Sequence, residues 1–73
     1  MADKAPVEIF GKDECGYTTA ARQDYATRGV EVRYFNVKKD PAAMARFLEL
    51  GEGQRRVPLI LDRGRVAIGF GGS

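Results

Sequence analysis

The chain contains one cysteine, Cys15, and no histidine among its 73 residues. One cysteine cannot form a disulfide within the chain. Without histidine or further cysteines, one copy of the chain cannot build the usual zinc sites either. Domains this short often depend on disulfides or metals for stability. The chain must therefore fold by packing alone, and its 44% hydrophobic and 30% charged residues are typical of a globular protein.

Length and charge predict one domain that acts without nucleic acid or a membrane. We expect a single domain over residues 1–73, with its core at about 6–70, because a domain usually has ~150 residues. The net charge of +2 lies in four late arginines partly balanced by two acids, which is too little for a nucleic-acid site. No segment has the ~20 apolar residues of a membrane span, and residues 1–6 lack the apolar run of a signal peptide. An unpaired cysteine is typical of the cytoplasm, where we expect a monomer.

Hydrophobic periodicity predicts six elements in the order β-α-β-α-β-β. We expect strands at 7–10, 32–37, 58–61 and 65–68, and helices at about 17–28 and 41–50. Asp40 and Pro41 are typical of a helix start, and Gly29 suits the left-handed residue after a helix. A strand–helix–strand start favours parallel pairing, and the last two strands favour a hairpin. The fold class is therefore α/β, with a mixed four-stranded sheet and helices packed on it.

Cys15 lies between a strand and the start of a helix, where a thiolate is favoured. The backbone N–H groups and partial positive charge of a helix N-terminus stabilise an anion, and Lys12 adds a cation. Gly16 lets the backbone approach a bound sulfur closely, and the Thr18 hydroxyl is placed to donate toward it. The alternative is a cysteine buried for packing, which is the commoner fate of a free cysteine. The charged segment Lys12–Glu14 favours exposure, and its two acids are interpreted as solvated loop charges.

The element order and two motifs together resemble a glutaredoxin of the thioredoxin fold. The motifs are Cys15-Gly16-Tyr17-Thr18 at the first strand–helix junction and Arg56-Val57-Pro58 before the third strand. The resemblance covers essentially residues 6–70. It implies a thiol–disulfide oxidoreductase with glutathione or a similar thiol as co-substrate. A disulfide or a glutathionylated protein would be the substrate.

The resemblance implies roles for the first motif. Cys15 would be the nucleophile, and Lys12 would attract a carboxylate of glutathione. Tyr17 would flank the sulfur; the alternative for Tyr17 is a core aromatic at the start of the helix. Gly16 and Thr18 would support the thiolate.

The resemblance also implies roles for residues before the third strand. Val57 would pair its backbone with the cysteinyl part of glutathione, as an added strand does. Pro58 would follow a cis peptide bond, an expectation that comes from the family alone. Arg55 or Arg56 would bind the glycine carboxylate of glutathione, because an arginine guanidinium can form two parallel hydrogen bonds with a carboxylate. The alternative for both arginines is a solvated loop.

The chain departs from the family pattern at Thr18, which stands where a resolving cysteine is common. The resemblance then implies a monothiol cycle, in which a second glutathione releases the first from a mixed disulfide. The motif is also similar to the Cys-Gly-Phe-Ser of monothiol glutaredoxins that share a [2Fe–2S] cluster between two subunits. Cys15 would ligate iron only in that shared way. Otherwise no metal site is expected, and a redox-inert adaptor on the same fold is a third alternative.

The C-terminal segment is the second departure. Family members usually continue into a last helix after a Gly-Gly-x-Asp segment, whereas this chain stops at Gly71-Gly72-Ser73. We therefore expect the final helix to be absent, and with it the N–H groups that hold the γ-glutamyl carboxylate near Gly71 and Gly72. The short form also resembles a bacterial branch that can carry selenocysteine at the position of Cys15. Cys15 would then be either the natural residue of a cysteine-containing homologue or an expression substitute for selenocysteine.

Overall fold

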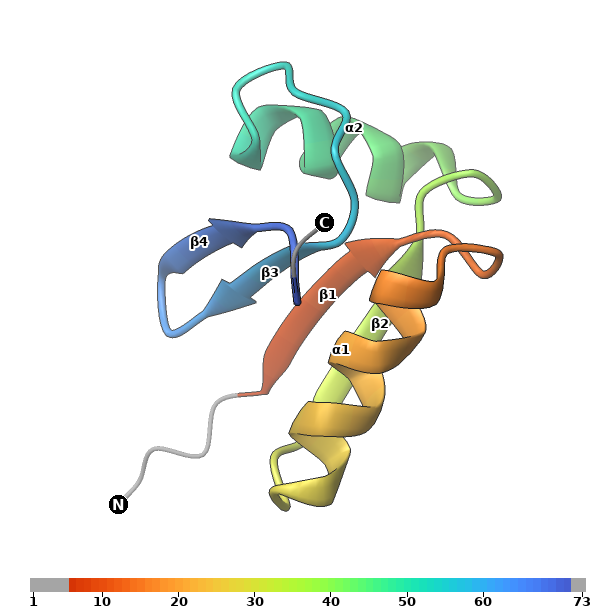
Figure 1. The fold of residues 1–73 in the computed structure, drawn as a ribbon. Helices are drawn as coiled ribbons and strands as arrows, with labels where there is room; N and C mark the ends of the chain where they lie inside the picture. The colour runs from red at the N-terminus through yellow and green to blue at the C-terminus, as the bar shows by residue number, and fades with distance from the viewer. Residues whose placement is uncertain (1–5, 72–73) are drawn as a thin grey trace.

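The computed structural model describes residues 6–71, and these form the six predicted elements in the predicted order (Figure 1). The sheet has the strand order β2-β1-β3-β4; β1 is parallel to β2 and antiparallel to β3, and β3 and β4 form a hairpin. The mixed four-stranded sheet is confirmed. Within residues 6–71 no helix follows β4. The elements are β1 (Val7–Gly11), α1 (Gly16–Thr27), β2 (Val32–Asn36), α2 (Pro41–Leu50), β3 (Leu59–Asp62) and β4 (Arg65–Ile68).

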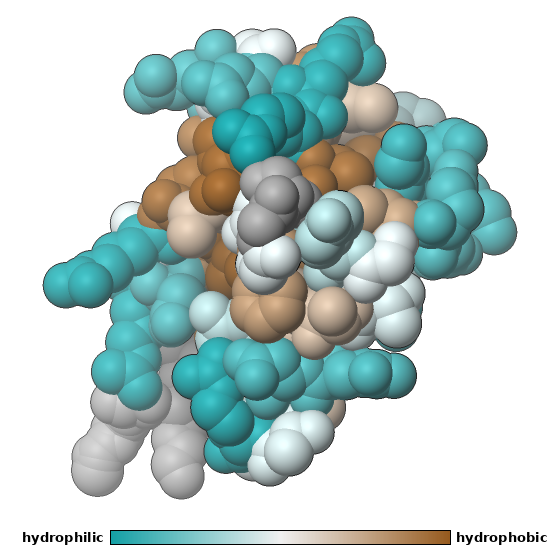
Figure 2. Space-filling view, in the orientation of Figure 1, coloured by the Kyte–Doolittle hydropathy of each residue, from teal (hydrophilic) through white to brown (hydrophobic). Residues whose placement is uncertain are grey.

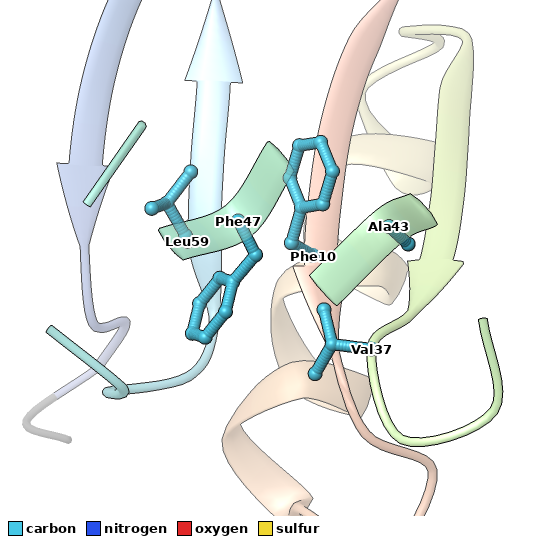
Figure 3. Packing of buried hydrophobic residues seen from close by; sticks show 5 residues of the cluster. All are labelled: Phe10, Val37, Ala43, Phe47 and Leu59. Carbon is cyan, nitrogen blue, oxygen red and sulfur yellow. The ribbon is translucent and has the colours of Figure 1, made fainter. Parts of the chain in front are cut away.

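The two helices cover opposite faces of the sheet, and side chains that alternate along the central strands serve both cores. On the α2 face, Phe10 of β1 and Leu59 of β3 pack with Phe47 (Figure 3). On the α1 face, Ile9 and Ile60 pack in the cluster that contains the helical residue Ala21. Figure 2 shows hydrophilic residues over α2 and the lower part of α1, with hydrophobic surface between them. No helix within residues 6–71 is long and apolar enough to cross a membrane.

Four strand ends differ from the prediction by one residue. β1 and β3 each extend one residue further, to Gly11 and Asp62, where the sequence predicted the start of a loop or turn. β2 ends at Asn36 rather than Val37, because the Asn36 side chain accepts the Lys38 backbone N–H at 2.9 Å and turns the chain. Val37 is nevertheless buried in the core under α2. β3 begins at Leu59 rather than Pro58, which has no N–H to donate to a ladder.

The predicted helix-end residues are confirmed. The Asp40 carboxylate accepts the backbone N–H groups of Ala42 at 3.0 Å and Ala43 at 3.3 Å, and Pro41 is the first helical residue of α2. Gly29 has a φ of 78° directly after the C-cap of α1. These local signals set where the helices start and stop, and thereby where α1 presents its N-terminus.

Candidate active site

One end of the sheet gathers the residues that the sequence singled out. In β1 and β2, Gly11 is opposite Asn36, so the loops after both strands leave at the same end. In the antiparallel pair, Phe10 is opposite Leu59, which brings the segment before β3 to this end too. The Gly69 N–H donates to the Pro58 carbonyl at 2.8 Å, so the segment after β4 joins it. The topology thus collects three segments far apart in the sequence beside the start of α1.

Cys15 is the N-cap residue of α1. Its backbone is extended, with φ −87° and ψ 116°, and its carbonyl accepts the first helical hydrogen bond, from Thr19 at 3.2 Å. The side chain is only partly buried, which does not fit a cysteine retained for packing. No acidic residue lies in the first turn of α1 to compete with an anion there. The predicted position of the thiol at a helix start is therefore confirmed.

The pKa of the Cys15 thiol is lowered from its ordinary value. Burial alone raises this pKa, but the Thr18 hydroxyl and the backbone N–H groups of Thr18 and Tyr17 outweigh burial, and the charge of Lys12 lowers it further. These groups lower the pKa because they can hydrogen-bond to the thiolate, although the side chain makes no capping hydrogen bond in the structure. A larger thiolate fraction near neutral pH makes the sulfur a better nucleophile.

Thr18 is fully buried against the end of β1. A Cβ atom added to Gly11 would lie 2.5 Å from both the Oγ1 and the Cγ2 of Thr18, so only glycine fits at position 11. The Thr18 Oγ1 has no hydrogen-bond partner within residues 6–71. A buried hydroxyl without a partner costs stability. The same hydroxyl lowers the pKa of Cys15.

Gly16 and Tyr17, which directly follow Cys15, are exposed to solvent. Tyr17 is 47% exposed, so its interpretation as a core aromatic is wrong. A Cβ atom added to Gly16 would meet nothing within 4 Å, which leaves the approach to the sulfur free. Lys12 is partly buried, and its carbonyl accepts the Cys15 backbone N–H at 3.2 Å. This turn holds the Lys12 charge close to the thiol.

The segment before β3 carries the predicted cis peptide bond, between Val57 and Pro58. Pro58 is fully buried, and Val57 packs against the core under α2. Within residues 6–71 the Val57 backbone makes no hydrogen bond to another backbone group, so it is available to a ligand. Arg55 and Arg56 are both exposed.

Of the two glycines predicted near the C-terminus, only one can be placed. Gly71 is exposed with a φ of 64° and lies two residues after Gly69, whose N–H is hydrogen-bonded to Pro58 before β3. Gly72 lies outside the described residues. The position of Gly71 at this end of the sheet agrees with the prediction; its role in binding stays a prediction.

The sequence reading missed the contacts of Asp13 and Glu14. Both are exposed, but they are paired rather than simply solvated. The Tyr34 hydroxyl donates to Asp13 at 2.8 Å, and Lys39 lies 3.8 Å from the same carboxylate. Lys38 donates to Glu14. Two acids after one strand and two lysines after its parallel neighbour were the available signal, because such strands end side by side.

Two ionisations reflect these contacts. Burial, followed by the hydrogen bond to Asp13, raises the pKa of Tyr34 to about 12. The hydrogen bond from Lys38 lowers the pKa of Glu14 below its ordinary value. At neutral pH the phenol is thus protonated and able to donate, and the carboxylate is charged and able to accept.

A resident metal does not fit one copy of the chain. Within residues 6–71 no three side chains of histidine, cysteine, aspartate or glutamate lie together in a way that could hold an ion. Cys15 could supply one thiolate at most. A cluster would need its remaining ligands from outside the chain.

Comparisons with known proteins agree with this geometry. The chain is similar to the thioredoxin-like protein BC3987, at 26% identity over 89% of this chain and 88% of that one, with a TM-score of 0.79. It is similar in fold to the glutaredoxin-like NrdH-redoxin from Escherichia coli, at 24% identity over 90% and 84% of the two chains, with a TM-score of 0.76. A buckwheat glutaredoxin solved with glutathione gives 25% identity, over 88% of this chain and 60% of that one, with a TM-score of 0.71.

The comparison with family models is the decisive one. A comparison with curated protein sequences gave no match. The sequence model of the glutaredoxin family, in contrast, matches residues 7–66, which span every strand and helix except the last two residues of β4. With its single thiol at the start of α1 and its cis proline before β3, the chain therefore belongs to the glutaredoxin family and is a glutaredoxin-like redox protein of the thioredoxin fold.

Proposed function

We propose that this chain is a monothiol oxidoreductase that reduces mixed disulfides with glutathione or another low-molecular-weight thiol. The observation that carries the proposal is Cys15, the one cysteine of the chain, with a lowered pKa at the N-terminus of α1. Thr18 fills the position at which a resolving thiol would stand. The second thiol of the cycle must therefore come from outside the chain.

The cycle has two exchanges, each of which forms one S–S bond and breaks one. The Cys15 thiolate attacks the glutathione sulfur of a glutathionylated protein, and the protein thiolate leaves and takes up a proton. The thiolate of a second glutathione then attacks the glutathione sulfur now bound to Cys15. Oxidised glutathione leaves, and the Cys15 thiolate is restored. The net reaction transfers two electrons from glutathione to the mixed disulfide and releases the protein thiol.

Glutathione recognition is supported by the groups around Cys15. The Val57 backbone is available for strand-like pairing with a short peptide. Lys12 and the exposed Arg55 and Arg56 offer positive charge for the two carboxylates of glutathione. The buckwheat glutaredoxin that is 25% identical to this chain over the matched region was solved as a glutathione complex. A small thiol without carboxylates, such as 2-mercaptoethanol, would lack these contacts.

The test is turnover of a glutathionylated peptide, followed by release of oxidised glutathione. We expect wild type to turn over and Cys15→Ser to be inactive, since serine cannot form the mixed disulfide. Thr27→Ser, which changes an exposed residue at the far end of α1, is the matched control and should retain the rate. Replacing glutathione by 2-mercaptoethanol at equal thiolate concentration should lower kcat/KM if the carboxylates are recognised. Equal activity of wild type and Cys15→Ser would refute the proposal.

A further inference from the structure

We propose that Tyr34 and Lys38 clamp the loop Lys12–Glu14 and thereby position the Cys15 sulfur at the start of α1. Neither residue touches a substrate in this proposal; both act through the loop. The inference deepens the proposed function, on which it rests for the role of Cys15. Its physical basis is that two side chains of one neighbouring segment contact Asp13 and Glu14, the two residues that directly precede the nucleophile.

The first tether is the hydrogen bond from the Tyr34 hydroxyl to Asp13, at 2.8 Å. Tyr34 lies on β2 and packs in the core under α1. The Arg22 guanidinium of α1 lies 3.9 Å from the centre of its ring. Tyr34 therefore contacts α1 and the loop that leads into α1, and it fixes one against the other.

The second tether comes from the turn after β2. The Lys38 backbone is held by the Asn36 side chain, and its ammonium donates to Glu14, the residue before Cys15. Lys39 adds a longer ion pair to Asp13, at 3.8 Å. Exposed ion pairs contribute little to global stability. Because these contacts all meet one short loop, we infer that they hold this loop in place rather than stabilise the whole fold.

Control of the loop matters because thiolate stabilisation at a helix start is short-ranged. The effect of a helix terminus falls off within its first turn. The Cys15 side chain makes no capping hydrogen bond that would hold it in register by itself. Its position depends on the Lys12–Cys15 turn, whose N–H to carbonyl distance is 3.2 Å. A loop that moves would carry the sulfur away from the N–H groups of Tyr17 and Thr18.

The test measures the rate at which iodoacetamide alkylates Cys15, first at pH 6 and then over a series of pH values. It requires no turnover. Tyr34→Phe removes one hydroxyl and no charge at this pH. We expect its alkylation rate to fall about threefold, because fewer molecules hold the thiolate in register. The pH profile should shift toward that of a free cysteine. The charged groups of the loop and of the residues that contact the loop or Tyr34 are unchanged in this variant: Lys12, Asp13, Glu14, Arg22, Lys38 and Lys39.

Asp13→Ala separates positioning from simple electrostatics. Removing a negative charge near a thiolate should by itself speed alkylation at pH 6, whereas loss of the tether should slow it. Asp13→Asn keeps an oxygen that can accept from Tyr34 and should not slow alkylation. Slower alkylation in Asp13→Ala and Tyr34→Phe supports the clamp. Unchanged or faster alkylation in both overturns it.

Two controls keep the result interpretable. Arg28→Gln breaks the exposed ion pair to Asp24 at the other end of α1 and should leave alkylation unchanged. Urea unfolding of each variant shows whether the chain remains folded under the assay conditions. Because alkylation needs neither glutathione nor a disulfide substrate, the clamp can hold while the turnover assay fails. The reverse outcome, normal turnover with unchanged alkylation in the variants, refutes the clamp alone.

Discussion

At the scale of single residues, Thr18 links stability to reactivity. Its buried hydroxyl has no hydrogen-bond partner within residues 6–71, and its side chain fills the space that Gly11 leaves open. A buried unsatisfied polar group costs about 1–3 kcal/mol. The same hydroxyl lowers the pKa of Cys15. The residue therefore combines an energetic cost to the fold with a benefit to the thiolate.

We predict that Thr18→Val makes the protein more stable and less reactive. Valine keeps the shape of threonine and removes the buried hydroxyl, so we expect the free energy of unfolding to rise by about 1 kcal/mol. The pKa of Cys15 should rise, and alkylation at pH 6 should slow. Urea unfolding and iodoacetamide kinetics measure the two effects. Thr19→Val, at the exposed neighbouring position, should change neither. Lower stability in Thr18→Val would instead show that the hydroxyl is satisfied by the sulfur.

At the scale of the elements, the two helices end in the same way with different residues. In α1, the Gly29 N–H donates to Ala26 and the Val30 N–H to Tyr25, each at 3.0 Å, and Gly29 is left-handed. This is the double hydrogen-bond pattern of a Schellman motif.

In α2, Glu52 and Gly53 make the equivalent bonds to Glu49 and Leu48, but the left-handed residue is Glu52, with a φ of 56°. A residue with a Cβ is strained in this conformation, whereas glycine is not. The end of α2 is therefore the weaker of the two helix termini.

We predict that Glu52→Gly stabilises the fold by about 0.5–1 kcal/mol, since relief of the left-handed strain exceeds the entropy that glycine adds to the unfolded chain. Gly29→Ala is the matched opposite change and should destabilise by a similar amount. The urea concentration at the midpoint of unfolding, compared with wild type at an unchanged m-value, measures both effects. A midpoint in Glu52→Gly at or below that of wild type would contradict the prediction.

At the scale of the whole molecule, the sheet connects the site to the stability of the chain. The loops after β1 and β2 and the segment before β3 meet at one end, so the Cys15 environment exists only in the folded state. The pKa of Cys15 is lowered there relative to the unfolded chain. Proton binding to Cys15 is thus linked to folding.

We predict that stability depends on pH through Cys15. Because its pKa is lower in the folded chain, the unfolded chain binds more protons between the folded value and the ordinary value of about 8.5. The free energy of unfolding from Cys15 should therefore rise with pH across that interval. The contribution is complete above the ordinary value and is lost as the pH falls through the folded pKa. The difference between wild type and Cys15→Ser, in urea titrations at several pH values, isolates this contribution. A difference that is flat or falls with rising pH would contradict it.

Much of the fold was predictable because its signals are local. Asp40 with Pro41 marked the start of α2, and Gly29 marked the end of α1. Capping and periodicity depend on residues within a few positions of one another. The position of Cys15 at a helix start followed from the same signals.

Local signals failed where a contact spans the chain. Tyr34 meets Asp13 across 21 positions and Lys38 meets Glu14 across 24, and both contacts require the parallel register of β1 and β2. No short-range sequence pattern specifies which residues of the two strands lie opposite each other, or which side chains in the following loops meet. For the same reason the two acids were interpreted as solvated, and the exposure of Tyr17 stayed open.

The sequence by itself determined the element order, the helix ends and the presence of a single thiol. The tertiary structure alone decided what surrounds the thiol. It buries Thr18 against Gly11, brings the cis Pro58 segment to the end of β1, and ties the loop before Cys15 to β2. The physical reason is that the pKa of a thiol depends on neighbours within a few ångströms, and strand pairing chooses those neighbours from distant parts of the chain.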